Sequence, residues 1–391
     1  MKPSLLVAAP HYGKVSEVWM RRQIQHLGAF NIHVLTWSLE DDSEASKQVT
    51  VLDDFDWNSH AGQTRWLRRA QNSLDLNFYG VLGGEKRAIS NIVNTLNPDV
   101  VLAHFGPTAL KVLPITKQQG IPLVTHFHGY DLSSGLKSPW YRWSLQSQNS
   151  AFFASIVVGE FQRSVLKDLG YREETVHCIP CGVPVAEFQA KVDPSSEKQN
   201  GPRFIYVGRL VKQKGIDISL RAFRRVLDDH PTSVLTIVGD GPEETAIKEM
   251  IHGFRLSSNV RLTGPLKQND VLKELRKSDI YVQHSLPGLD GALEGFGVSI
   301  TEASACGLPV VTTNTGGIPD QITNGENGFL VSPHDEVGMA QRMLELANDP
   351  EKRRRMGDKA CERARQFFDT AILTKRLQAL LLDAASGTHG Q

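Results

Sequence analysis

Residues 204–227 read FIYVGRLVKQKGIDISLRAFRRVL, and this stretch holds the signals that decide the fold. The apolar run Phe204–Val207 is short and ends at a glycine, as buried strands do. A polar loop carrying Arg209 and Lys214 follows it. Apolar residues then recur at helical spacing, at Ile216, Leu220, Phe223 and Leu227. The stretch therefore predicts a strand, a loop and an amphipathic helix.

The same alternation of strand and helix extends along the chain in both directions. Runs bounded by glycine and proline are typical of strands buried on both faces, and their alternation with helices favours parallel sheets. The predicted class is α/β, with doubly wound parallel sheets. Further strands are expected at Leu5–Ala9, Ile32–Thr36, Val100–Ala103, Leu123–His126, Ile156–Val158, Val234–Val238, Val260–Leu262, Ile280–Gln283 and Val310–Thr313.

The length of 391 residues suits two or three domains at roughly 150 residues each. Residues 190–202 are polar and rich in turn formers, which is linker composition. We expect a Rossmann-like domain over 1–187, a linker over 188–202 and a second Rossmann-like domain over 203–366. A helix and tail follow over 367–391, indicated by Leu373, Leu377, Leu380 and Leu381.

Charge and cysteine content exclude several classes of protein. The 43 Lys+Arg and 43 Asp+Glu balance, and residues 1–187 carry 17 of each, so no basic domain for nucleic acid is expected. Four cysteines are too few for a disulfide scaffold and indicate a reducing compartment. Cys178 and Cys181 have the spacing of half of a redox or zinc site, but we interpret them as small residues at a strand end.

No apolar run approaches the ~18 residues of a membrane span, and no signal peptide is evident, so a cytoplasmic protein is expected.

Four strand ends in the second half carry glycine or charge. Gly208, Arg209 and Lys214 follow the first; the guanidinium fork and the ammonium together suit a diphosphate, although a solvated loop is the alternative. The segments 239–242 and 314–320 are glycine-containing turns after two other strands. Because the carboxyl ends of parallel strands meet at one edge of a sheet, these turns predict a nucleotide pocket.

The segment 291–303, GALEGFGVSITEA, is the most informative of these loops. Gly295 and Gly297 precede a helix that we expect to begin near Val298, where free backbone N–H groups attract anions. Glu302, one turn into that helix, suits ribose hydroxyls better than phosphate, because like charges repel. Glu294 would face the same pocket. The alternative is a helix cap with two solvated acids.

In the first half, His126-x-His128 at a strand end resembles half of a metal site, with His104 and His11 as third-ligand candidates. We expect a polar wall that contacts substrate, and no metal. The loop after the first strand, which contains Gly13, should line the same cleft.

These motifs together resemble retaining glycosyltransferases of family 4, and the bacterial exopolysaccharide and colanic-acid-type group in particular. The resemblance rests on Arg209-x4-Lys214, Gly239–Pro242 and Glu294-x7-Glu302, and more thinly on His128-Gly129-x-Asp131. It implies the GT-B fold: two Rossmann-like domains facing a cleft, with a C-terminal helix that crosses back onto the first. It also implies a metal-independent hexosyltransferase that needs no cofactor and uses a nucleotide sugar, UDP-sugar above all, to extend a glycan or lipid-linked glycan.

The resemblance also assigns roles to residues. Glu294, His128, Arg209 and Lys214 are the implied catalytic residues, and His104 and Asp131 lie on the implied acceptor side. Two departures from the family pattern are that Gly13 stands alone, where many members have paired glycines, and that Cys181 replaces an asparagine. The implied donor-binding residues are Gly13, Gly208, Arg209, Lys214, Gly239, Pro265, Leu266, Glu294, Phe296, Gly297, Val298, Ser299 and Glu302.

Other functions remain open at this level. A dehydrogenase is disfavoured because no GxGxxG follows the first strand, whereas a GT-B-shaped epimerase and a non-catalytic glycan-binding relative remain. Basic and aromatic residues at 65–69, with Arg21 and Arg22, would suit peripheral contact with anionic lipid at the inner face of the membrane; a solvated helix is the alternative.

Overall fold

The computed structural model describes residues 1–13, 17–40, 48–52, 83–189 and 201–387. The chain divides into two compact units, Met1–Cys181 together with Ala371–Gln391, and Gly182–Thr370. Helix α15 (Thr370–Ser386) therefore carries the end of the chain back into the first unit, as the resemblance implies. Its Leu373, Leu377 and Leu381 are buried there.

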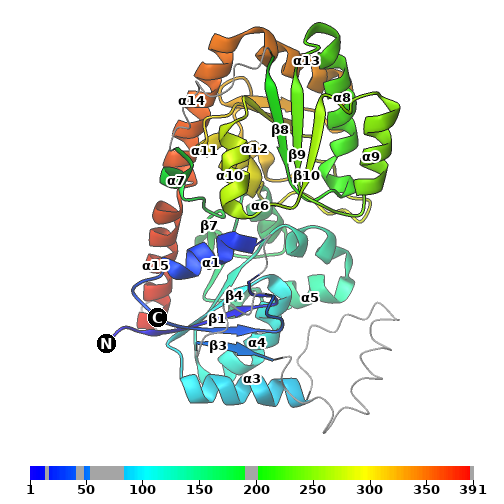
Figure 1. Ribbon diagram of the computed structural model, residues 1–391. Helices are drawn as coiled ribbons and strands as arrows, with labels where there is room; N and C mark the ends of the chain where they lie inside the picture. The colour runs from blue at the N-terminus through cyan, green and yellow to red at the C-terminus, as the bar shows by residue number, and fades with distance from the viewer. Residues whose placement is uncertain (14–16, 41–47, 53–82, 190–200, 388–391) are drawn as a thin grey trace. The chain divides into compact units, whose positions relative to one another are not determined.

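The first unit is built on a seven-stranded parallel sheet in the order β3–β2–β1–β4–β5–β6–β7 (Figure 1). The order reverses between β1 and β4, which is the arrangement of a doubly wound Rossmann sheet. The strands are β1 (Ser4–Ala9), β2 (Asn31–Thr36), β3 (Val49–Val51), β4 (Val100–His104), β5 (Leu123–His126), β6 (Ala154–Val157) and β7 (Val176–Cys178).

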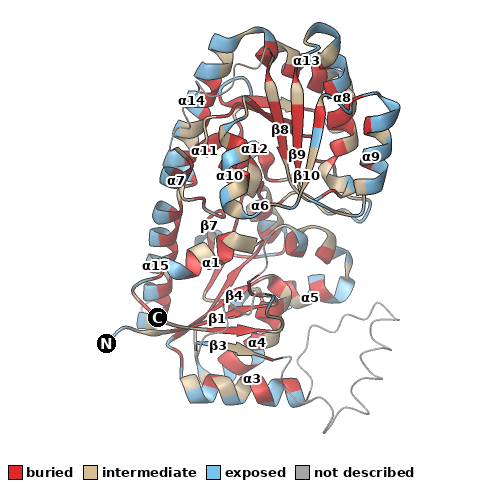
Figure 2. Cartoon of the chain, viewed as in Figure 1, coloured by how far each residue is buried: buried red, intermediate tan, exposed pale blue. Residues whose placement is uncertain are grey.

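Helices cover this sheet and complete its core. The central strands β1, β4 and β5 have almost no exposed side chains (Figure 2), and each fully buried Leu or Val contributes about 1.5–3 kcal/mol of hydrophobic free energy. The main helices are α1 (Val18–Gln25), α3 (Gly83–Leu96), α4 (Gly106–Gln119), α5 (Pro139–Ser147) and α6 (Glu160–Asp168), with a 3₁₀ turn at Tyr130–Leu132.

The second unit repeats this plan with six parallel strands in the order β10–β9–β8–β11–β12–β13, which again reverses beside its first strand. Figure 1 shows α8 (Ile216–Asp229) and α9 (Glu244–Gly253) on one side of this sheet and α10 (Gln268–Arg276) and α11 (Val298–Ala305) on the other. The strands are β8 (Arg203–Val207), β9 (Val234–Val238), β10 (Val260–Gly264), β11 (Ile280–Gln283), β12 (Val310–Thr313) and β13 (Gly328–Val331).

Three helices of the second unit, α8, α11 and α12, begin directly after a glycine. Gly215 caps α8 with a left-handed φ of 54°, and a Cβ there would overlap the carbonyl oxygen of His284, so only glycine fits. The helices are α7 (Val185–Gln189), α8 (Ile216–Asp229), α9 (Glu244–Gly253), α10 (Gln268–Arg276), α11 (Val298–Ala305), α12 (Ile318–Gln321), α13 (Glu336–Asn348) and α14 (Pro350–Phe367).

The predicted fold class is confirmed, and all ten predicted strands are present. Three strands escaped the sequence patterns: β3, β7 and β13. Each lies at an edge of its sheet. β3 and β7 have only three residues and no continuous apolar run, whereas the apolar residues of β13 are bounded by Gly328 and Pro333, a signal that the prediction did not use.

Some predictions fall on residues that the structure does not describe. The basic and aromatic segment Arg65–Arg69 lies outside the described residues, as does most of the predicted linker, at 190–200. Within the described part of the chain, none of the helices combines the length and the apolar composition needed to cross a bilayer.

Candidate functional site

The loops after β8, β9 and β10 form the floor of the candidate site, and backbone hydrogen bonds tie them together. The Gly239 amide donates to the Gly264 carbonyl at 3.0 Å, and the Gly208 amide donates to the Val238 carbonyl at 3.0 Å. Gly239 has a φ of 129°, and a Cβ there would overlap the Gly208 carbonyl oxygen. Glycine at Gly239 thus lets two loops approach closely.

Arg209 extends from the β8 loop into solvent. Its carbonyl accepts a 2.9 Å hydrogen bond from the Tyr206 hydroxyl, which holds the loop backbone in place. Burial raises the pKa of Tyr206, with the nearby Tyr281 and Glu294 adding to the rise, so the hydroxyl stays protonated as a donor. Among the residues that the structure describes, no carboxylate pairs with the exposed Arg209 guanidinium. Five N–H donors are therefore available to an anion.

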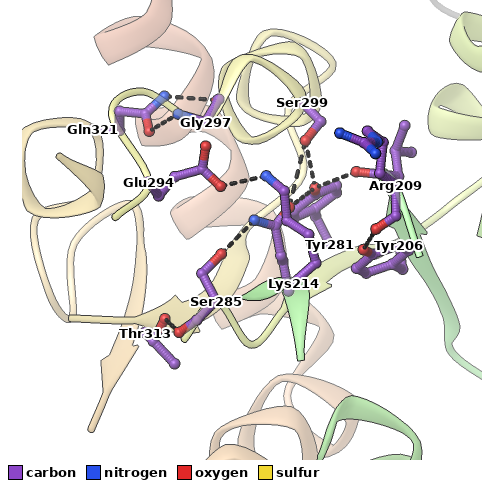
Figure 3. A network of polar contacts seen from close by, with 12 residues as sticks. Tyr206, Arg209, Lys214, Tyr281, Ser285, Glu294, Gly297, Ser299, Thr313 and Gln321 are labelled. Atoms are coloured by element: carbon purple, nitrogen blue, oxygen red, sulfur yellow. Dashed lines mark hydrogen bonds and ion pairs between the residues drawn. The ribbon is translucent and has the colours of Figure 1, made fainter. Parts of the chain in front are cut away.

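Lys214 and Glu294, which are 80 residues apart in sequence, form an ion pair between Lys214 Nζ and Glu294 Oε2 (Figure 3). Their side chains are 22% and 16% exposed, so the pair is shielded from water yet reachable from the loop edge. A lysine ammonium has three donors, so one contact with Glu294 leaves two for a ligand. Lys214, the residue predicted to bind the diphosphate, and Glu294, the residue predicted to bind the sugar, are therefore in direct contact.

The loop from Glu294 to Gly297 is held by a residue that the sequence patterns did not identify. The Gln321 side-chain oxygen accepts from the Gly297 amide at 3.0 Å, and its nitrogen donates to the Gly297 carbonyl at 2.8 Å and to Thr301 Oγ1 at 2.5 Å. Gln321 is buried. The Gly317 amide donates to the Glu294 carbonyl at 2.8 Å, so the turn at 314–320 supports this loop.

Ser299, in the first turn of α11, belongs to a polar network beneath the loops. The Tyr281 hydroxyl lies 2.8 Å from Ser299 Oγ and 2.8 Å from Gln283 Oε1 (Figure 3). Burial raises the pKa of Tyr281, which keeps this hydroxyl neutral. The network fixes the Ser299 side chain at the start of the helix, where the first N–H groups have no partner within the helix.

The remaining predicted donor residues border the same edge of the sheet. Glu302 is buried in α11, and its Oε1 accepts a 2.9 Å hydrogen bond from Gln268 Nε2 of α10. Pro265 and Leu266 follow β10 directly. Phe296 packs edge to face on Phe368, with ring centroids 5.4 Å apart. The predicted residues of the second half therefore lie on loops at the carboxyl ends of β8–β11 or in helix α11, which follows one of them.

The predicted residues of the first half lie in the other unit and form a different kind of cluster. His104 and His126 end neighbouring strands in register, and the rings of His126 and His128 are 4.4 Å apart. One ligand nitrogen from each of the three rings lies within 4.8 Å of the others. His11, the other third-ligand candidate, is apart from them, with its Nδ1 4.0 Å from Glu40 Oε1.

Burial controls the charge of these rings. All three are fully buried, and desolvation lowers the pKa of His126 to about 3 and those of His104 and His128 well below 6.5. For His104 and His128, neighbouring rings add to the lowering. The cluster is therefore neutral at physiological pH.

Asp131 organises the loop that carries His128. Its Oδ1 accepts from the His128 amide at 2.7 Å, and its Oδ2 accepts from the Gly106 amide at 3.0 Å, at the start of α4. Burial raises the pKa of Asp131 to about 6, and these backbone donors oppose the rise. The carboxylate thus has a backbone role within the first unit. Gly13, with a φ of 86°, lies in the loop after β1.

Two doubly wound parallel sheets in one chain, with glycine loops and basic side chains at the carboxyl edge of the second, define a GT-B protein. Comparison with known families agrees with this class. Residues 16–187 match the family described as Glycosyltransferase Family 4, and residues 187–363 match Glycosyl transferases group 1. The chain belongs to these glycosyltransferase families.

Relatives and solved structures extend the comparison. The chain is 29% identical over 327 residues, 81% of its length and 79% of the relative's, to WcaL of Salmonella typhimurium, which is provisionally named a colanic acid biosynthesis glycosyltransferase. The structure of Anabaena Alr3699/HepE in complex with UDP has a TM-score of 0.76 at 19% identity, over 97% of this chain and 100% of that one. Sucrose-phosphate synthase of Thermosynechococcus elongatus has a TM-score of 0.77 at 16% identity, over 98% and 100%. These structures share the fold.

Proposed function

We propose that the protein transfers a hexose from a UDP-sugar to a glycan or lipid-linked glycan acceptor with retention of anomeric configuration. The observation that carries this proposal is the Lys214–Glu294 ion pair, together with the exposed Arg209 on the same loop, at the carboxyl edge of the second sheet. This arrangement offers cationic donors and one carboxylate at one edge of the sheet, as a sugar diphosphate requires.

Arg209 and Lys214 would hold the diphosphate. When the bond between the anomeric carbon and the β-phosphate oxygen breaks, negative charge accumulates on the departing nucleoside diphosphate. Fixed cationic donors aimed at that charge stabilise the transition state, and one such donor is typically worth about 10²–10³ in rate. The start of α11, with the Ser299 hydroxyl and free backbone amides, would bind a phosphate oxygen. No metal ion is required for this step.

Glu294 and Glu302 would orient the rest of the donor. Glu294 uses Oε2 for Lys214, which leaves Oε1 to accept hydrogen bonds from sugar hydroxyls. Glu302 would accept from the ribose hydroxyls, and the base would lie against Pro265 and Leu266. Gln268, which donates to Glu302 Oε1, fixes that carboxylate in orientation.

Retention follows if attack and departure occur on the same face of the sugar. The acceptor hydroxyl oxygen then bonds to the anomeric carbon as the bond to the β-phosphate oxygen breaks, and its proton passes to the departing diphosphate. Two carboxylates flanking the glycosidic bond would serve a hydrolase, but Lys214 already holds Glu294, and Glu302 lies in the helix behind the loop. A contact of His128 with the sugar rests on the family resemblance alone.

The names of the relatives support an acceptor in polysaccharide assembly. They include the colanic acid protein above and an amylovoran biosynthesis glycosyltransferase of Erwinia amylovora, 29% identical over 64% of this chain. The Anabaena structures include complexes with UDP, with UDP and glucose, and with UDP-glucose, which makes UDP-glucose the first donor to test.

A panel of nucleoside diphosphates and nucleotide sugars, measured by thermal shift, tests the donor assignment. UDP should raise the melting temperature of the wild type, since a ligand that binds only the folded state stabilises it. Lys214→Ala should reduce the shift, whereas Lys212→Ala, an exposed residue of the same loop, should not. If none of the nucleoside diphosphates shifts the melting temperature, the proposed function is wrong. Incubation of UDP-glucose with and without acceptor then separates transfer from epimerisation.

A further inference from the structure

The family resemblance implies roles for His128 and His104 but not for the three-histidine cluster of the first unit as a whole. This cluster collects three metal-ligating side chains in a buried space. His104 and His126 point to the same face of the sheet because they stand in register on neighbouring parallel strands. His128 joins them because the Phe127 amide still donates to the Ile156 carbonyl, at 2.7 Å, beyond the last assigned residue of β5. The alternation of side chains thus continues to His128.

One pair in the cluster has the spacing of metal ligands. His104 Nδ1 lies 3.3 Å from His128 Nε2, and the two atoms are hydrogen-bonded. Two nitrogens bound to Zn²⁺ at about 2.0–2.1 Å in tetrahedral geometry are separated by about 3.3 Å. The ligand nitrogens of all three rings lie within 4.8 Å of one another, so a bound ion would draw the rings closer together.

Some ring nitrogens of the cluster are buried without a partner. Among the residues that the structure describes, both ring nitrogens of His126 and Nε2 of His104 lack a partner that meets hydrogen-bond geometry. A cation bound to one nitrogen of His126 would give that buried atom a partner.

Other side chains contact the rings of the cluster, as the residues around metal-binding histidines do in known metal sites. Cys181 Sγ lies 4.0 Å from His128 Nδ1. Trp19 packs against the cluster, with its ring 4.4 Å from that of His128. Three neutral nitrogens in an aromatic enclosure select Zn²⁺ and similar first-row ions over Mg²⁺ or Ca²⁺.

We propose that His104, His126 and His128 form a binding site for one divalent first-row transition ion, Zn²⁺ in the first instance. The site is separate from the donor loops of the second unit and does not depend on the proposed transfer reaction. Bound metal would engage the His128 ring and fix the loop that Asp131 organises. Three protein ligands leave a coordination position open to water or an added ligand.

Metal content tests the site directly. Untagged protein would be expressed with added Zn²⁺, purified and measured by elemental analysis, then stripped with a chelator and titrated with Co²⁺. The wild type should hold about one equivalent of Zn²⁺ and give the visible absorption of low-coordinate Co²⁺. His126→Asn and His104→Asn should lose both. His33→Asn, a half-buried histidine of β2 that bonds Thr50, is the matched control and should keep both.

The proposal does not rest on the variants alone, because a buried substitution can prevent folding. X-ray absorption of the Zn²⁺-loaded wild type should show three imidazole nitrogens. A wild type that binds well below one equivalent, metal content that is unchanged in folded His126→Asn, or a zinc shell without imidazole would each overturn the proposal.

Discussion

The two sheet edges that carry the candidate residues are alike in topology and opposite in chemistry. Both lie at the carboxyl ends of strands in a doubly wound parallel sheet. The edge of the second unit exposes Arg209 and partly exposes Lys214, whereas the edge of the first unit buries three neutral histidines.

The difference shows how burial selects the ligand. A charged group keeps its charge only where water or an opposite charge reaches it, so the open edge retains cations for an anionic donor. A fully buried imidazole loses its proton and becomes a lone-pair donor. The same topology thus carries the proposed diphosphate site in one unit and an uncharged cluster in the other.

Lys214→Ala should have the largest effect, on the rate of transfer. We expect kcat to fall about 10²–10³-fold, because one donor to the departing phosphate is lost. Lys214→Arg should recover part of the rate. The control, Lys212→Ala, should change the rate less than about twofold, as surface substitutions do. Equal losses in the two alanine variants would mean that general loop charge, and not the pair with Glu294, is responsible.

Gln321→Ala should lower the stability of the second unit by about 2–4 kcal/mol, since three buried hydrogen bonds disappear. Urea unfolding measures this loss, and the affinity for UDP-glucose should fall with it. Gln366→Ala, at an exposed position of α14, is the control. A stable Gln321→Ala protein with unchanged affinity would show that the Gly297 loop needs no such support.

Asp131→Asn should lower the stability of the first unit only. The new amide group would place a donor against one of the two backbone N–H groups that Asp131 accepts from, at a cost of about 1–3 kcal/mol. Asp168→Asn, exposed at the end of α6, is the control. Urea unfolding should report the loss while calorimetry finds UDP affinity unchanged. A fall in UDP affinity as well would contradict the view that the carboxyl edges of the two sheets act independently.

Glu302→Gln should have the smallest effect, which should be confined to the binding of the ribose. A neutral acceptor is weaker than a carboxylate, so the preference for UDP over 2′-deoxy-UDP should shrink by about tenfold at most. Glu249→Gln, exposed on α9, is the control. An unchanged ratio of the two dissociation constants would remove Glu302 from the ribose site.

The sequence predicted the central strands and the donor loops because their signals are local. An apolar run, a glycine and a following helix lie within about 25 residues, as in 204–227. Gln321 was missed because its contacts to Gly297 cross 24 residues and its neighbours look like any short helix. The histidines were predicted to form a polar wall without a metal, and their close cluster was not foreseen. The alternation of His126 and His128 depends on strand pairing beyond β5, which no local pattern shows.

Calorimetric titration of UDP and UMP into the wild type, Arg209→Ala and Lys212→Ala tests the central claim most directly. If Arg209 and Lys214 hold the diphosphate, the wild type binds UDP more tightly than UMP. Arg209→Ala should then reduce that difference, and Lys212→Ala should preserve it. Equal affinity of the wild type for UDP and UMP, or a difference that survives Arg209→Ala in full, would contradict the account.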